Sequence, residues 1–120
     1  MNYLWIALGS ALGGCARYAL GAAITQWLGP QFPWGTFTIN VLGCLAIGAV
    51  SSALESVEWR LFLMVGLCGG FTTFSSFGLE TLQLIRTGHP GKAFAYIGMS
   101  VLIGLLAVWI GHVSMAGLER

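Results

Sequence analysis

The chain has 120 residues, of which 57% are hydrophobic and only 8% are charged. Soluble domains carry about 25% charged residues, so this composition excludes a soluble monomer, and its high hydrophobicity excludes an intrinsically disordered chain. The formal net charge of +1 provides no basic field that would attract nucleic acid. We therefore expect one domain of a small membrane protein that crosses the bilayer several times.

Four apolar runs are long enough to cross a ~30 Å hydrocarbon layer, which takes about 20 helical residues. In chain order they cover residues 2–28, 35–54, 59–86 and 92–117. The short connections between them contain prolines, glycines or carboxylates, as helix boundaries do. The sequence predicts an all-α membrane protein in which residues 1–120 form a single four-helix transmembrane domain.

The first run contains one charged residue, Arg17. Charges at membrane depth usually face the protein interior or water, and long basic side chains also snorkel to the interface. We expect Arg17 either to stabilise an anion at a vestibule or to snorkel.

Three cysteines lie far apart inside apolar runs, and they are predicted to be small buried apolar residues: Cys15, Cys44 and Cys68.

The second run carries an amide, Asn40, about one turn inside its start. An amide in hydrocarbon needs hydrogen-bond partners, and its nitrogen offers two donors. Asn40 is therefore expected either to donate to a permeating anion or to form an interhelical hydrogen bond.

The third run is polar at its centre, where two adjacent glycines, Gly69 and Gly70, precede a group of hydroxyls. The hydroxyl residues are Thr72, Thr73, Ser75 and Ser76. Glycine weakens a helix, and hydroxyls offer the backbone alternative hydrogen bonds. We predict an interruption near residues 69–75, with a continuous helix as the alternative. Unwound backbone at membrane depth can coordinate a cation through its carbonyls.

Further along the third run, Phe74 and Phe77 are three residues apart and share a helix face. Phenyl rings have a positive edge, so these rings either stabilise a small anion or simply pack. Glu80 lies further along the same run. We expect it to be a proton-coupling carboxylate, a pathway residue or a snorkelling group at the interface. On the fourth run Tyr96 and Ser100 are four residues apart and form a short polar track.

The chain has no Asp, and no set of catalytic residues can be assembled, so an enzyme is not expected.

Basic residues are balanced between the two sides of the membrane. With four spans, Arg60 and Arg120 lie on one side, and Arg86 and Lys92 lie on the other. Orientation follows the Lys/Arg bias of short loops, so this sequence favours neither orientation. Either the chain inserts both ways and pairs as an antiparallel dimer, or other signals fix one orientation.

Three motifs in the same order resemble those of the CrcB/Fluc fluoride channels, and size and span number agree along the whole chain. The motifs are Gly13-Gly14 with Arg17-Tyr18 in the first run, GTFTINVLG at 35–43, and GGFTTFSSF at 69–77. The departures are mild. Ser76 replaces a usual threonine, Gly104 stands where a further track hydroxyl is expected, and Cys44 stands where a small residue is usual.

The resemblance implies a dual-topology antiparallel homodimer in the prokaryotic cell membrane. Such a dimer has two pores and passes fluoride out of the cytoplasm, passively and with high selectivity. The implied fluoride pathway comprises Arg17, Asn40, Thr73, Phe74, Phe77, Glu80, Tyr96 and Ser100. The rings of Phe74 and Phe77 would present their edges to fluoride, and Asn40 would donate to it. Backbone carbonyls of Gly69 and Thr72 would hold a structural sodium ion at the dimer centre.

The alternative function is a small proton-coupled exporter of cationic compounds. That class also has four short helices, but it relies on a carboxylate in its first span. Here the first span has no acidic residue and carries Arg17 instead, so Glu80 would have to take that role. A non-transporting subunit is a third possibility, although it would have no use for an interrupted third span.

Overall fold

The computed structural model describes residues 1–118, and these residues are helical apart from short connections. Three long helices are α1 (Asn2–Leu28), α2 (Trp34–Ala53) and α6 (Pro90–Leu118). Between α2 and α6 lie four shorter elements, which together we call the third helical segment: α3 (Val57–Arg60), η1 (Leu61–Cys68), α4 (Gly69–Phe71) and α5 (Phe74–Arg86). No strand occurs within residues 1–118, in agreement with the all-α prediction.

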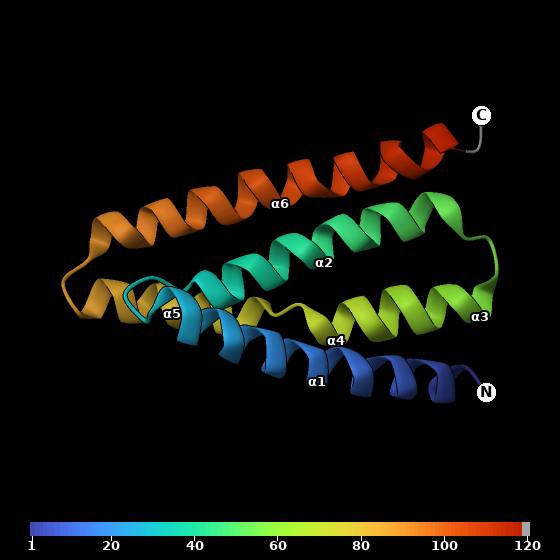
Figure 1. Cartoon of the computed structure of the whole chain (residues 1–120), viewed down its shortest axis with the longest axis horizontal. Helices are drawn as coiled ribbons and strands as arrows, with labels where there is room; N and C mark the ends of the chain where they lie inside the picture. Colours follow the sequence, from blue (N-terminus) through green and yellow to red (C-terminus); the bar gives the residue numbers. More distant parts are fainter. Residues whose placement is uncertain (119–120) are drawn as a thin grey trace.

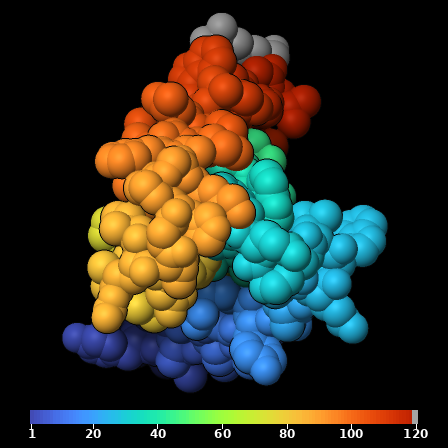
Figure 2. Space-filling view, turned by 90° about the vertical axis from the view of Figure 1, so that its left-hand side faces the viewer, coloured from blue at the N-terminus to red at the C-terminus, as the bar shows by residue number. Residues whose placement is uncertain are grey.

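The helices lie lengthwise beside one another, and α2 is central (Figure 1). α6 packs mainly on α2, whereas α1 packs mainly on η1 and α4 of the third helical segment. Viewed along the long axis, α6 and α1 are on opposite sides of the molecule (Figure 2). The result is an open arrangement that is 47 Å long, rather than a closed four-helix bundle.

Close packing between helices depends on glycine. A Cβ atom added at Gly9 of α1 would collide with the Phe62 carbonyl oxygen and the Gly66 backbone of η1. On the other side of the molecule, a Cβ atom at Gly111 of α6 would collide with the Leu45 carbonyl oxygen of α2. Small residues let backbones approach closely where no hydrophobic drive acts between helices, so both helix pairs have interfaces of the membrane type.

Three helices are long and apolar enough to cross a membrane: Trp34–Ala53, Val57–Arg86 and Pro90–Leu118. α1 has 27 residues but is not among them, because Arg17, Gln26 and many small residues lower its hydropathy. Large apolar side chains are exposed along the helices, for example Leu102 at 70% and Trp109 at 62%. The chain is therefore a multi-pass membrane protein, with apolar side chains turned to lipid or to other protein.

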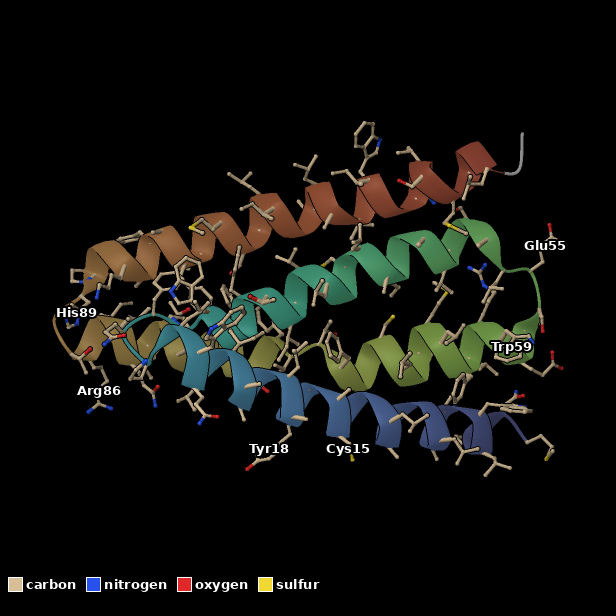
Figure 3. The ribbon with its side chains drawn as sticks, viewed as in Figure 1. Cys15, Tyr18, Glu55, Trp59, Arg86 and His89 are labelled. Atoms are coloured by element: carbon tan, nitrogen blue, oxygen red, sulfur yellow. The ribbon has the colours of Figure 1, made fainter. Side chains whose placement is uncertain are left out.

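Charged residues gather at the two ends of the molecule. Figure 3 shows Arg86 and His89 at one end and Glu55 and Trp59 at the other. Arg60 lies near Glu55, where its guanidinium donates to the Leu54 carbonyl oxygen at 2.7 Å. Arg120, which entered the predicted charge balance, lies outside the described residues.

Candidate functional site

The third helical segment is interrupted at two residues, Thr72 and Thr73, which have extended backbone angles. The interruption is narrower than predicted, because Gly69–Phe71 is still helical. The Thr72 amide and hydroxyl both donate to the Cys68 carbonyl oxygen, at 3.0 and 2.9 Å. The Thr73 hydroxyl caps α5 by accepting from the Ser76 amide at 3.1 Å. Threonine suits this position because it is β-branched and its hydroxyl can cap a helix.

Asn40 of α2 holds the interruption open through two hydrogen bonds to one residue. Its Nδ2 donates to the Thr73 carbonyl oxygen at 3.1 Å, and its Oδ1 accepts from the Thr73 amide at 2.8 Å. In a continuous helix the Thr73 amide would donate to the Gly69 carbonyl instead. The interhelical hydrogen bond expected of Asn40 is therefore present, and the second Nδ2 hydrogen has no partner within the described chain.

Arg17 reaches the same interruption from α1. Its Nε donates to the Gly70 carbonyl oxygen at 3.3 Å, so the guanidinium satisfies one of the carbonyls at the end of α4. Arg17 also lines a cavity of about 530 Å³ together with Thr36, Thr73 and Ser76. The side chain is half-buried and is bonded to the backbone of the interrupted segment.

Aromatic rings connect α5 with α6 beside the interruption. The Phe74 and Phe77 ring centroids are 5.6 Å apart, and the Phe77 ring lies 5.0 Å from that of Tyr96. Phe74 is 83% exposed and Phe77 is half-buried. Both rings line a cavity of about 350 Å³ with Asn40 and Ser100, so the structure brings these four predicted residues together.

The hydroxyls of Tyr96 and Ser100 are buried and have no hydrogen-bond partner. Tyr96 is completely buried. A buried polar atom without a partner costs about 1–3 kcal/mol, and such atoms are uncommon in folded proteins. Ser100 lines the central cavity, so its hydroxyl points to a ligand, an ion or a water that approaches from that cavity, whereas the Tyr96 ring is buried against Phe77.

Glu80 lies in the middle of α5 and lines a cavity that extends to the connection between α5 and α6. Its carboxylate accepts a hydrogen bond from the Thr36 hydroxyl at 2.5 Å. The cavity measures about 480 Å³, and its lining also includes Gln83, His89 and Lys92. It shares Thr36 with the Arg17 cavity, and that cavity shares Thr73 with the central one. Polar groups therefore continue from the end of the molecule to the interruption.

Thr36 is the functional candidate that sequence reasoning missed. A signal was available, since Thr36 and Asn40 are four residues apart and therefore share one helix face.

The prediction that all three cysteines are buried needs a correction. Cys68 is buried and Cys44 half-buried, but Cys15 is exposed, and its side chain points away from the other helices (Figure 3).

Comparisons with known proteins give one consistent result. The family model described as CrcB-like protein, Camphor Resistance (CrcB), matches residues 4–112. A protein of Methylocella silvestris named fluoride-specific ion channel FluC is 51% identical, with 100% of this chain and 97% of the relative covered. A protein of the same name from Acidobacterium capsulatum is 48% identical, with 94% of each chain covered. A third, from Paramagnetospirillum magneticum, is 47% identical over 100% of this chain and 99% of its own.

These relatives are named as ion channels and not as enzymes. Both the family match and the identities extend over nearly the whole chain, including the interruption and the residues around it. The chain therefore belongs to the CrcB-like family.

Proposed function

We propose that this protein is a passive, fluoride-selective channel that exports fluoride from the cytoplasm. The observation that carries the proposal is the pair of buried, unpartnered hydroxyls of Tyr96 and Ser100 beside the Phe77 ring, in a chain whose relatives are named fluoride-specific ion channels. A dry passage lined by hydroxyls and ring edges can replace the water of a small anion without a buried positive charge that would trap it.

Each residue has a separate role along this proposed pathway. Phe74 and Phe77 present ring edges to the ion, and the free Nδ2 hydrogen of Asn40 donates to it. Tyr96 and Ser100 continue the track with hydroxyls, and Thr73 lies where the central cavity meets the next one. Conduction needs several favourable but weak sites rather than one strong site, and neutral donors of this kind meet that condition.

Charged residues belong to the ends of the pathway. Arg17 borders the cavity that joins the interruption to the 86–92 end, where its charge attracts anions. Glu80 is held by Thr36 near the mouth and is a pathway residue. The hydrogen bond from the Thr36 hydroxyl holds its carboxylate in one position.

The functional unit in this proposal is an antiparallel homodimer with two pores, in which all four helices of each chain span the membrane as one domain. Two observations support it. The open arrangement leaves the Phe74 ring, at 83% exposure, without a cover. Basic residues also lie at both ends, Arg86 at one (Figure 3) and Arg60, bonded to the Leu54 carbonyl, at the other, so that both orientations are possible.

A sodium ion at the dimer centre fits the oxygen atoms available at the interruption. The Gly69 carbonyl loses its helical partner because the Thr73 amide binds Asn40. The Thr72 carbonyl loses its partner because the Ser76 amide binds the Thr73 hydroxyl. Carbonyl oxygens of unwound helix are suitable ligands for sodium. The ion would supply positive charge that offsets these carbonyl dipoles.

Fluoride efflux from liposomes that contain the purified protein tests the proposal. A potassium ionophore balances the charge, and chloride efflux is the control. We expect rapid fluoride release without chloride release. Absence of release from a folded, reconstituted dimer would reject the channel and turn attention to proton-coupled export through Glu80. That alternative predicts uptake of a cationic dye driven by a pH gradient, and its loss in Glu80→Gln.

A further inference from the structure

Two cysteines line the central cavity, and the proposed fluoride pathway uses neither. Cys44 belongs to α2, and Cys68 is the last residue of η1. Both thiols are free, and both residues line the cavity of about 350 Å³ at the interruption. Cys15, in contrast, is exposed on the outer side of α1 (Figure 3). Two cysteines therefore line one central cavity, and the third is on the surface.

Neighbouring groups restrict the positions of both central cysteines. The Cys68 carbonyl accepts two hydrogen bonds from Thr72, which ties this residue to the interruption. Cys44 follows Gly43, where an added Cβ atom would collide with the Thr72 methyl group. A Cβ atom at Gly104 of α6 would lie 3.6 Å from the Cys44 sulfur. The two residues are therefore held by packed backbone around one cavity.

The chemistry of this pair suits a particular class of cation. Thiol sulfur is a soft ligand that selects soft metals such as Cu(I). Zinc would need three or four ligands, and residues 1–118 contain no group of three His, Cys, Asp or Glu side chains placed to hold a metal. Two sulfur atoms are sufficient for Cu⁺ and Ag⁺, because these d¹⁰ ions accept linear two-coordinate binding.

We propose that Cys44 and Cys68 form a binding site for one soft monovalent cation of the Cu⁺ and Ag⁺ class. The ion replaces the proton of one thiol, which passes to water, and the second thiol donates a lone pair. The complex is then neutral, as an apolar cavity requires. Phe74, Phe77 and Ser100 line the same cavity, so the bound ion obstructs the fluoride pathway. This last consequence rests on the proposed function.

Binding is tested without any reference to transport. The full chain with Cys15→Ala, which removes the surface thiol, is titrated with silver nitrate by calorimetry in chloride-free detergent solution. We expect one Ag⁺ per chain. Adding Cys44→Ala or Cys68→Ala should weaken binding by about 100-fold, the gain that a second linked ligand provides. No binding, two ions per chain, or equal affinity after loss of either thiol would each overturn the site.

Obstruction is tested by fluoride efflux in nitrate medium, with each variant compared with its own efflux before silver is added. At a silver concentration that saturates Cys15→Ala but lies well below the dissociation constant measured for Cys15→Ala/Cys44→Ala, silver should stop efflux in the first variant and leave it unaffected in the second. Bound silver without inhibition would overturn the obstruction. A lack of efflux from every variant before silver is added would reject the channel, while the calorimetry would still decide the cation site.

Discussion

Around the interruption, individual side chains have two different tasks. Asn40, Thr73 and Arg17 are bonded to backbone, and they shape the interruption. Phe77 lines the central cavity and packs against the buried ring of Tyr96. Substitutions in the first group should therefore change both stability and transport, whereas substitutions in the second group should change transport alone.

Replacing Phe77 tests whether the edge of its ring stabilises fluoride. Phe77→Ile keeps an apolar side chain but removes the quadrupole of the ring, so we expect fluoride efflux to fall to background while the protein stays folded. Phe94→Ile is the matched control, because Phe94 is 72% exposed on α6 and should retain normal efflux. Full efflux in Phe77→Ile would remove this ring from the mechanism.

Replacing Asn40 tests the hydrogen bonds that hold the interruption. Asn40→Asp removes the donor to the Thr73 carbonyl and places two acceptors face to face. We expect a loss of about 1–3 kcal/mol in stability, together with weaker fluoride efflux, because a negative charge or an unwanted proton lies beside the ion. Thermal unfolding in detergent and liposome efflux measure the two effects. Asn2→Asp makes the same change at an exposed position and should have neither effect.

At the scale of helices, the molecule combines close glycine packing with one interrupted segment. η1 has π-helical hydrogen bonding, a geometry often found at functional sites, and it leads directly into the interruption. α1 and α2 supply the side chains that bind the backbone groups freed there, Arg17 and Asn40, and α6 supplies the Tyr96 and Ser100 hydroxyls. The position of α6 relative to α2 consequently decides whether Ser100 reaches the central cavity.

A methyl group at the α2–α6 contact tests this positional requirement. Gly111→Ala should lower stability by about 1–3 kcal/mol through overpacking and should reduce fluoride efflux, because α6 must move away from the Leu45 carbonyl. Gly98→Ala on the same helix meets open space and should raise stability by about 0.5–1 kcal/mol. Thermal unfolding of both variants gives the comparison, and equal stability would show that the contact is not tight.

At the scale of the whole molecule, exposed apolar surface and the distribution of charge dominate. The buried hydrophobic side chains are few, while large apolar side chains are exposed on the helices. A single chain also leaves the central cavity lined by an exposed Phe74. Exposed apolar surface of this extent marks contact with lipid or with other protein, and it agrees with the proposed antiparallel dimer.

Biasing the orientation of insertion tests the antiparallel dimer. Lysines added to the 54–57 connection, or instead to the 86–90 connection, should each fix one orientation. Each variant alone is expected to lose fluoride efflux, and co-expression of the two should restore it. Normal efflux from either variant alone would argue against the antiparallel arrangement, and matched glutamine insertions control for changes in the loops.

The sequence by itself determined the helical class and the approximate helix boundaries, because apolar length and turn residues are local properties. It also located the interruption within residues 69–75. Only the tertiary structure decided that the glycines stay helical while Thr72 and Thr73 leave the helix, because the competing hydrogen bond comes from Asn40 on another helix. The Thr36–Glu80 bond and the shared cavity of Cys44 and Cys68 likewise join residues far apart in the chain. Local patterns do not contain such contacts, since the packing of helices creates them.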